Sequence, residues 1–424
     1  MSREMKDSGV AWIGDIPKGW EIHKGKHVLA IQKRSIRETD DVITCFRDGE
    51  VVLRSERRTQ GFTFSDKEIG YQGINKGDIV IHGMDGFAGA IGISKSTGKG
   101  SPVLIVCNPF QNDNSEYLVQ YLHVLAQTNV FLALATGVRE RSCDLRWNKI
   151  TDLPFVIPPQ SEQNLIMEFL NTKCAEIDNL ISLLEEMIRE LKAYKQSVIT
   201  EAVCKGLNKN VPMKDSGIEW IGEIPRDWEI RKVTYIYENI GSGTTPKSSN
   251  DSYYVEKGYS FLQTGDLNDG IIEKTAKYLS EKALEECSLK TYPKGSLVIA
   301  MYGATIGKLG ILNIETVTNQ ACCVLFGKSE YDKMFGYYMF FADRTNLIMK
   351  ANGGGQPNIS QDIIKNDKLP VPPLTEQQTI ANYLDEKCGN IEGLLAIKQA
   401  KIDELKEFKK SLIYEYVTGK KSVI

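Results

Sequence analysis

The sequence contains no long uninterrupted run of apolar residues, although 42% of its 424 residues are hydrophobic. A helix that crosses a bilayer needs about 20 mainly apolar residues in succession. A secretory signal needs a shorter apolar stretch, which the first residues, Met-Ser-Arg-Glu-Met-Lys, do not provide. We therefore predict neither a membrane span nor a signal peptide, and we expect the protein to stay in the cytoplasm.

The sequence also lacks the cysteine and histidine patterns of metal sites and disulfide frameworks. Its nine cysteines form no Cys-x-x-Cys pair, and Cys322 and Cys323 are adjacent in a strand-like run. Zinc sites and disulfide-rich folds need cysteines at regular, paired spacings. The four histidines are scattered along the chain, which makes them poor metal ligands. We predict no metal site.

An excess of positive charge is missing as well. The chain has 52 Lys and Arg against 55 Asp and Glu, a formal net charge of −3. A strongly basic domain is the usual sign of a DNA-binding protein. The charge balance therefore gives no support to DNA binding, although it does not exclude it.

What the sequence does contain is one framework written twice. The segment from Met5 to Ile22 returns from Met213 onwards, at an offset of 208, with both tryptophans, the Ser-Gly and the Ile-Pro in register. Pro158-Pro-Gln-Ser-Glu-Gln163 returns as Pro372-Pro-Leu-Thr-Glu-Gln377, at an offset of 214. This period is far longer than the roughly 20–50 residues of solenoid repeats. The sequence thus predicts two whole domains that share the repeated flanking segments and differ in the residues between them.

Between the repeated segments, each half has the pattern of a mixed α/β domain. Short β-branched runs punctuated by glycines, at 77–93 and 102–107 in the first half and 294–311 in the second, predict strands joined by tight turns. Apolar residues at helical spacing predict helices over 115–128 and 333–349. Each block then closes on a glycine-rich loop and a strand, which a double proline ends.

A long helix is predicted after each double proline. In the first, Ser161 is the expected N-cap, Glu162 lies in the first turn, and Gly206 ends the helix after Lys205. Positions spaced by four and three form a coiled-coil seam in both helices. These positions are Ile177, Ile181, Leu184, Ile188, Leu191, Lys195, Val198 and Ala202, and, 214 residues later, Ile391, Leu395, Lys398, Ile402, Leu405, Lys409, Leu412 and Tyr416.

Matched seams favour an antiparallel pair of helices, roughly 45 Å or more long, that separates the two blocks. The alternative is that each helix packs on its own domain.

No stretch carries a complete catalytic or cofactor motif. Gly241–Ser248 resembles a phosphate-binding loop, but proline stands where the second glycine must let the backbone wrap a phosphate. Gly303–Lys308 is one residue short of the same motif. Cys107-Asn-Pro-Phe110 lacks the second proline of the loop with which amino-methyltransferases grip a flipped base. We predict no catalytic residue and no cofactor in this chain.

Side chains suited to contacting nucleic acid remain in both blocks. Arginine forks read guanine edges and hold phosphates, whereas amides pair with adenine and lysines neutralise phosphates. The blocks differ in these side chains, so they should read different sequences if they bind DNA. For any one residue, a solvated charged face is the alternative. The candidates are Arg54, Arg57, Arg58, Arg139, Arg141 and Arg146 in the first block and Lys247, Lys274, Tyr302, Lys308, Asn352, Gln356 and Asn358 in the second.

Three motifs together indicate a family. Trp-Ile-Gly-x-Ile-Pro-x-x-Trp opens each half, Leu153 to Gln163 reads Leu-Pro-x-x-x-Pro-Pro-x-x-Glu-Gln with a tighter copy ending at Gln377, and Ile-Asp follows at 177–178. This layout resembles the specificity subunit of type I restriction-modification systems over essentially the whole chain. The second half departs mildly, because it has Ile391-Glu392 in place of Ile-Asp.

The resemblance implies four regions: a first target-recognition domain at 1–157, a spacer helix at 158–206, a second recognition domain at 207–371 and a second spacer helix at 372–424. Each recognition domain would read one half of a bipartite asymmetric site in the major groove of double-stranded DNA. The helices would set the gap between the half-sites. The subunit itself would be non-catalytic.

The resemblance also implies partners. Two methylation subunits would dock on the helices, bind S-adenosylmethionine and methylate adenine N6, and restriction subunits would use ATP and Mg for translocation and cleavage. Residues expected at the docking sites are Glu162, Gln163, Glu376 and Gln377. A two-domain protein-binding scaffold built on a coiled coil, with no role in nucleic-acid binding, is the alternative function.

Overall fold

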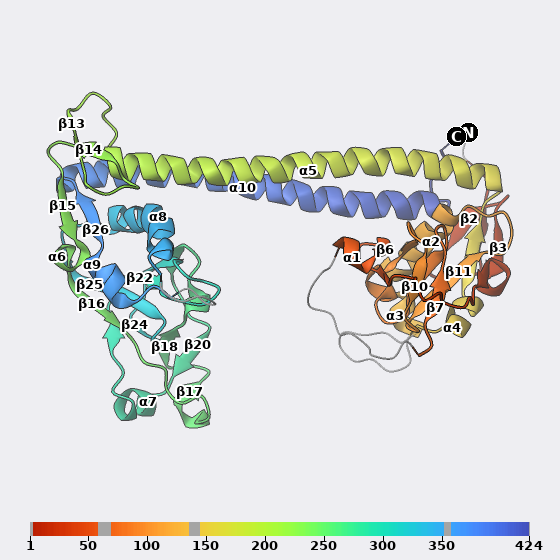
Figure 1. Cartoon of the computed structure of the whole chain (residues 1–424), viewed down its shortest axis with the longest axis horizontal. Helices are drawn as coiled ribbons and strands as arrows, with labels where there is room; N and C mark the ends of the chain where they lie inside the picture. Colours follow the sequence, from red (N-terminus) through yellow and green to blue (C-terminus); the bar gives the residue numbers. More distant parts are fainter. Residues whose placement is uncertain (1–2, 58–68, 135–144, 352–357, 424) are drawn as a thin grey trace. The chain divides into compact units, whose positions relative to one another are not determined.

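The computed structural model confirms the mixed α/β fold class with two long helices (Figure 1). The chain forms two compact units: unit 1 comprises Met1–Leu184 and Ala400–Ile424, and unit 2 comprises Glu185–Gln399. Each unit contains one part of α5 (Gln160–Lys205) and one part of α10 (Leu374–Val417). The structure describes residues 3–57, 69–134, 145–351 and 358–423.

A four-stranded antiparallel sheet forms the core of unit 1, in the order β4-β11-β8-β9. Ile79 and Ile81 of β8 pack with the apolar face of α2, whereas Val80 packs with the hairpin of β5 and β6. This alternation is what a strand buried on both faces requires. The bounds are β4 (Leu29–Ile31), β5 (Ile43–Cys45), β6 (Val51–Leu53), β8 (Ile79–His82), β9 (Ile91–Ile93), β11 (Leu104–Pro109) and α2 (Ser115–Gln127).

Shorter elements complete unit 1. Strands β7 and β10 form a separate two-stranded antiparallel ladder, and short helices flank the main sheet (Figure 1). Their bounds are β7 (Gln72–Ile74), β10 (Gly98–Gly100), α1 (Arg54–Arg57), α3 (Val130–Leu134), α4 (Trp147–Asp152), η1 (Gly25–His27) and η2 (Gly86–Ala88).

Unit 2 has a five-stranded sheet in the order β16-β25-β22-β23-β19, of which only the β19–β23 pair is parallel. Leu297 and Ile299 of β22 pack with α8, which covers one face, and Val298 packs on the other face. The predicted helix over 333–349 is confirmed. The bounds are β16 (Tyr237–Ser242), β19 (Gly270–Ile272), β22 (Leu297–Ala300), β23 (Leu309–Leu312), β25 (Cys322–Ser329) and α8 (Lys333–Met349).

A second five-stranded sheet, β17-β20-β18-β24-β21, has been inserted into unit 2. The sequence did not predict this sheet. Its strands are β17 (Tyr254–Val255), β18 (Tyr259–Leu262), β20 (Lys277–Leu279), β21 (Thr291–Tyr292) and β24 (Thr316–Thr318). Helices α6 (Val233–Ile236), α7 (Glu281–Glu286) and α9 (Gln361–Asn366), with η3 (Asp251–Tyr253) and η4 (Thr264–Asp266), complete the unit.

The repeated entry segments fold alike in the two units. Each forms a small antiparallel hairpin followed by a buried tryptophan, Trp20 or Trp228. Each is then followed by a strand that pairs with the strand predicted before the double proline. The bounds are β1 (Met5–Asp7), β2 (Asp15–Pro17), β3 (Glu21–Lys24) and β12 (Pro154–Ile157) in unit 1, and β13 (Met213–Asp215), β14 (Glu223–Pro225), β15 (Glu229–Lys232) and β26 (Lys368–Val371) in unit 2.

Within each unit the two long helices are joined by an equivalent ion pair. In unit 1, Lys409 of α10 lies 2.7 Å from Asp178 of α5. In unit 2, Lys195 of α5 lies 2.5 Å from Glu392 of α10. At the offset of 214, Asp178 corresponds to Glu392 and Lys195 to Lys409. The acidic residue that follows the repeated isoleucine therefore pairs with a lysine in the seam of the facing helix.

The helices run antiparallel in both units. In unit 1, Phe169 of α5 packs on Tyr416 near the end of α10, with ring centroids 4.6 Å apart. In unit 2, Met187 lies beside Lys398. Every predicted seam position is buried or half-buried, and most positions between them are exposed. The predicted coiled-coil seam is confirmed.

The helix ends are set by backbone groups of the flanking residues. The expectation that Ser161 caps α5 is wrong: the helix begins at Gln160, and the amides of Glu162 and Gln163 donate to the carbonyl of Pro159. The serine therefore lies inside the first turn. The predicted end is confirmed, because Gly206 follows Lys205 with φ +71, a left-handed conformation that favours glycine.

The last residues of the chain close unit 1. The Tyr117 hydroxyl donates to the carbonyl of Val417 at 2.9 Å. Lys420 Nζ donates to the carbonyls of Ile13 and Asp15 at 2.6 and 2.5 Å. The core of the first domain is thus completed by the far end of the chain.

In the part of the chain that the structure describes, no three His, Cys, Asp or Glu side chains gather closely enough to hold a metal ion. Over the same residues, no helix combines the length and the apolar character needed to cross a membrane.

Candidate nucleic-acid interface

Each unit presents a turn at the same end of its main sheet. Turn A (residues 83–89) follows β8 and turn B (residues 301–307) follows β22. Each begins with an amide bonded to the neighbouring strand segment, Gly83 to Val103 at 2.9 Å and Met301 to Ala321 at 2.8 Å. Gly89 and Gly307 end the turns with φ +97 and +75. The two turns are therefore equivalent, at an offset of 218.

The segment that follows each glycine-rich loop returns to these turns. The amide of Leu145 donates to the carbonyl of Gly83 at 2.9 Å, and the amide of Ile359 donates to that of Met301 at 2.8 Å. In unit 2 this contact extends to a β-bridge between Tyr302 and Asn358. Turn and loop end thus form one surface in each unit, built from residues far apart in the sequence.

In unit 2 the structure brings three of the predicted DNA-binding residues together. Tyr302 lies in turn B, Lys308 follows it directly, and Asn358 pairs with Tyr302. Lys247 and Lys274 are exposed, but they lie outside this turn, after β16 and β19. Two further candidates, Asn352 and Gln356, lie outside the described residues.

Among the described arginine candidates of unit 1, Arg54 and Arg57 lie on α1 and not in turn A, whereas Arg146 directly follows Leu145, whose amide bonds to that turn. Arg57, on α1, forms ion pairs with Asp48 and with Glu50, and its Cζ lies 4.3 Å from the centroid of the Phe46 ring. The hydrogen bond from Arg57 lowers the pKa of Asp48. Arg54 Nε donates to Thr44 Oγ1 at 3.3 Å. Arg146 precedes α4, and Arg58, Arg139 and Arg141 lie outside the described residues.

Turn A carries side chains that the sequence analysis missed. Met84 occupies the position that corresponds to Tyr302 and is 47% exposed. Arg47 Nη2 lies 2.7 Å from Asp85 Oδ1, at the base of the turn. The Nδ1 atom of His82 accepts a hydrogen bond from the Asp85 amide at 3.0 Å, and burial lowers the pKa of this histidine. An alignment of the two halves on Gly89 and Gly307 would have placed Met84 opposite Tyr302 and identified it as a candidate.

The Glu-Gln motif after each double proline acts inside the fold. Glu162 accepts a hydrogen bond from Trp20 Nε1 at 2.9 Å, and Glu376 accepts one from Trp228 Nε1 at 3.0 Å. Gln163 is fully buried: its Oε1 accepts from the Asn114 amide, and its Nε2 donates to the Pro158 carbonyl. Gln377 makes the equivalent bonds to Asp332 and Pro372. The motif thus joins each long helix to the tryptophan that follows the entry hairpin and to the residue that caps α2 or α8.

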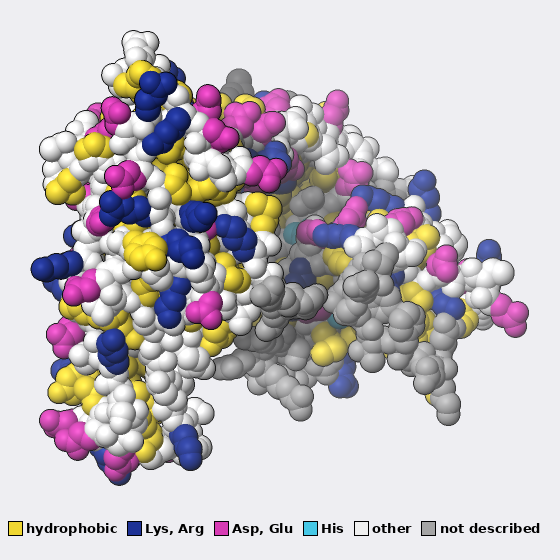
Figure 2. Space-filling view, turned by 60° about the vertical axis from the view of Figure 1, so that its left-hand side comes forward, with side chains coloured by type: hydrophobic (Ala, Val, Ile, Leu, Met, Phe, Trp, Pro, Cys, Tyr) yellow, Lys and Arg dark blue, Asp and Glu magenta, His cyan; other side chains and the backbone are white. Residues whose placement is uncertain are grey.

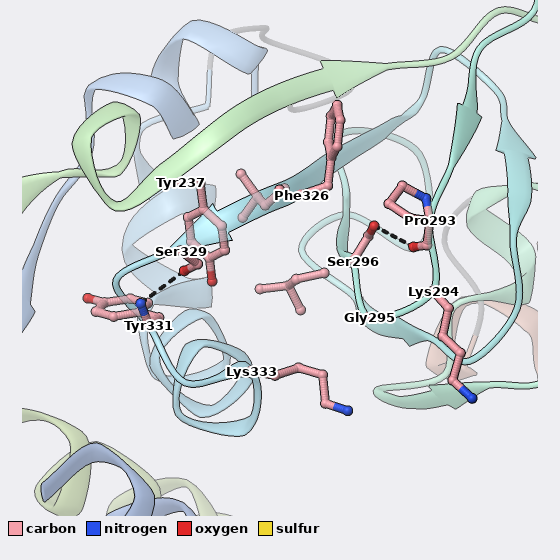
Figure 3. A pocket seen from close by; sticks show the side chains of 12 residues that line it. Tyr237, Pro293, Lys294, Gly295, Ser296, Phe326, Ser329, Tyr331 and Lys333 are labelled. Atoms are coloured by element: carbon pink, nitrogen blue, oxygen red, sulfur yellow. Dashed lines mark hydrogen bonds between the residues drawn. The ribbon is translucent and has the colours of Figure 1, made fainter. Parts of the chain in front are cut away.

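Unit 2 also contains a pocket of about 400 Å³, shown in Figure 3. It lies where β22 begins and β25 ends, so it is at the opposite end of the sheet from turn B. Tyr237, Phe326, Lys294 and Lys333 line it, and Ser296 donates to the Pro293 carbonyl at 2.6 Å. None of the predicted DNA-binding residues lies in this pocket.

Basic side chains gather on one face of unit 2 (Figure 2). Figure 2 shows Lys and Arg side chains gathered on the side of unit 2 that faces the viewer, with fewer acidic side chains among them. A net charge of −3 is therefore compatible with locally basic surface.

Comparisons with known proteins find relatives of this duplicated scaffold. Residues 225–407 match the family described as Type I restriction modification DNA specificity domain. A putative type I restriction enzyme MjaX specificity subunit of Methanocaldococcus jannaschii is 26% identical over 96% of this chain and 95% of that protein. The MjaVIII specificity subunit of the same organism is 28% identical over 62% of this chain and 61% of its own length.

Solved structures share the fold. A chain from a structure that describes complex assembly and conformational transition of the type I R-M system aligns with a TM-score of 0.72 at 15% identity, over 95% of this chain and 98% of its own. The HsdS subunit from Thermoanaerobacter tengcongensis aligns with a TM-score of 0.50, also at 15% identity and with the same coverage. Residues 225–407 therefore match a type I DNA specificity domain, and nearly the whole chain is similar in sequence to a putative type I specificity subunit.

Proposed function

We propose that this chain is the non-catalytic DNA specificity subunit of a type I restriction-modification complex. Each domain reads one half of a bipartite, asymmetric DNA site in the major groove. The observation that carries this proposal is the pair of equivalent turns, which present Met84 in unit 1 and Tyr302 with Lys308 and Asn358 in unit 2. One scaffold with two different groove-facing surfaces suits the recognition of two different half-sites.

The proposed regions are recognition domains at 1–157 and 207–371 and spacer helices at 158–206 and 372–424. A helix of 46 residues such as α5 is about 69 Å long, which is about two turns of the DNA duplex. We propose that the length of the helix pair fixes the number of unread base pairs between the half-sites.

The proposed partners are two methylation subunits and the restriction subunits of a cytoplasmic complex. S-adenosylmethionine, ATP and Mg would be bound by these partners and not by this chain. Large apolar side chains exposed on the long helices, Leu180, Leu183, Leu394, Ile397 and Phe408, support docking along the helices. Because Gln163 and Gln377 are buried, the Glu-Gln motif would act on docking only by holding the helix ends in place.

An exchange of residues 24–150 for the block of another family member tests the two-reader proposal. The complex of the hybrid chain with its methylation subunits should methylate sites with one changed half, the same second half and the same gap. Mapping of methylated adenines in cellular DNA measures all three at once. A change in both halves would contradict the modular proposal.

Salt dependence separates DNA recognition from the scaffold alternative. A specific DNA reader loses affinity steeply as salt is added, because phosphate contacts release counterions. We therefore expect retention on DNA by the chain with its methylation subunit at low salt, and release as salt rises. A complex that shows no salt-dependent DNA binding would favour the protein-binding scaffold.

A further inference from the structure

A forked ion pair between α8 and the loop before β19 underlies turn B. Arg344 Nη2 lies 2.5 Å from Asp269 Oδ1, and Nη1 lies 3.2 Å from Oδ2. A bidentate arginine–carboxylate pair fixes orientation as well as distance. The guanidinium is also packed, since its Cζ lies 4.6 Å from the centroid of the Phe341 ring. We call the pair of Arg344 and Asp269 the turn B clamp.

The clamp is tied to the strand that leaves turn B. The Leu309 amide donates to Asp269 Oδ1 at 2.9 Å, and the Asp269 amide donates to the Leu309 carbonyl at 3.0 Å. The Tyr337 hydroxyl of α8 donates to the Asp269 carbonyl at 2.6 Å. Leu309 is the neighbour of Lys308, so the clamp acts one residue away from a candidate DNA contact.

Arg344 also fills the space beneath the glycine that closes the turn. A Cβ atom on Gly307 would lie 2.8 Å from Arg344 Cγ and 3.2 Å from Ile348 Cδ1. The base of the turn is held by its own backbone, because the Gly307 amide donates to the Ala300 carbonyl at 2.8 Å. The turn therefore cannot settle towards α8 without displacing the arginine.

Turn A is held in another way. Arg47, which precedes β6, forms an ion pair with Asp85 of the turn. The side chain of Arg47 is 61% exposed, against 23% for that of Arg344. Exposed ion pairs are screened by water and constrain little. The half-buried clamp of unit 2 is thus a feature of one reader and not of the common scaffold.

We propose that Arg344 is a positioning residue for DNA recognition by unit 2. With Asp269 it holds turn B in one geometry, so that Tyr302, Lys308 and Asn358 meet the base edges together. This inference rests on the proposed function. Side chains that read a ligand must be held within about 0.5 Å of their working geometry. Most affinity for DNA comes from phosphate contacts, so a loose turn B reduces selectivity more than affinity.

The test uses the complex of the full chain with its methylation subunits, and the variants Arg344→Lys and Asp269→Asn. Binding is measured to the site found by methylation mapping and to duplexes with one substituted base pair in either half. Discrimination in the half read by unit 2 should fall roughly 10-fold, since a good base contact discriminates by about 1–3 kcal/mol. Discrimination in the other half and the salt dependence of binding should be unchanged.

Arg47→Lys is the matched control, because it alters the exposed pair of turn A and should leave the half read by unit 2 untouched. Should Arg344→Lys fail to fold in thermal melts, Arg344→Met keeps the packing beneath Gly307 and removes only the fork. Unchanged discrimination in the variants, or an equal loss in both halves, would overturn the positioning role. A wild-type complex without any bipartite preference would instead refute the proposed function.

Discussion

Two buried carboxyl groups in unit 2 yield a prediction about stability and pH. Asp343, on α8, is 0% exposed, and Asp367, after α9, is 5% exposed. Asn346 Nδ2 donates to Asp343 Oδ1 at 2.7 Å, and Lys350 Nζ donates to Asp367 Oδ1 at 2.6 Å. Burial raises the pKa of Asp343 well above its ordinary value of 3.8, and a hydrogen bond and the charge of Asp367 raise it further. Burial and the neighbouring Asp367 therefore favour the protonated form of the Asp343 carboxyl in the folded protein.

The perturbation is Asp343→Asn, which offers Asp367 an N–H donor that needs no proton. In the unfolded chain an aspartate ionises near pH 4. Because the folded pKa of Asp343 is the higher one, its contribution to stability is complete below the unfolded pKa and is lost as the pH rises towards the folded pKa. Over that window wild-type stability falls by about 1.4 kcal/mol per pH unit relative to the variant.

We expect the free energy of unfolding of Asp343→Asn to rise relative to wild type as the pH increases above about 4, until the pH reaches the raised folded pKa of Asp343. Denaturant unfolding of both proteins across this range measures the difference. Asp362→Asn, at an exposed position on α9, is the control and should show no such trend. If the free energies of unfolding of wild type and Asp343→Asn changed in parallel with pH, the raised pKa of Asp343 would be refuted.

Three further predictions concern the helices and their ends. Trp228→Phe removes the hydrogen bond to Glu376 and should lower the free energy of unfolding by about 1–2 kcal/mol in denaturant melts; an unchanged midpoint would contradict it. Ile402→Ala, at a seam position that is 1% exposed, should lower the free energy of unfolding by about 2–4 kcal/mol. Lys409→Ala, which removes the ion pair with Asp178, should lower it by less than about 1 kcal/mol, and this effect should vanish in high salt. Equal losses for the two variants would contradict the predicted seam. Gly206→Ala should cost about 1 kcal/mol or more, since alanine is strained at φ +71, and a stabilised variant would argue against that backbone conformation.

Much of the fold follows from local patterns in the sequence. The duplicated entry hairpins, α2, α8 and the two long helices are set by apolar spacing and by glycine and proline, which act over a few residues. The second sheet of unit 2 was not predicted, because neighbouring strands in it lie far apart in the sequence. One of them, β24, pairs in parallel with β18, more than fifty residues earlier. Such pairing depends on residues distant in the sequence.

The candidate site was predicted only in part. Tyr302 and Asn358 were singled out separately, and their pairing depends on a bridge across 56 positions. Met84 was missed because the offset between the halves changes from 208 at the entry hairpins to 218 at the turns. The role of the Glu-Gln motif was also hidden, since its hydrogen bonds run to Trp20 and Trp228, which lie 142 and 148 residues earlier in the chain.

The division of unit 1 between the two ends of the chain has a consequence for its synthesis. Unit 2 is one continuous segment, Glu185–Gln399, and is complete when that segment has left the ribosome. Unit 1 must wait for Ala400–Ile424, because Val417 and Lys420 bond to its hairpin and its core helix. A premature stop codon near the 3′ end of the message would therefore prevent unit 1, which is translated first, from folding completely, and would leave unit 2 intact.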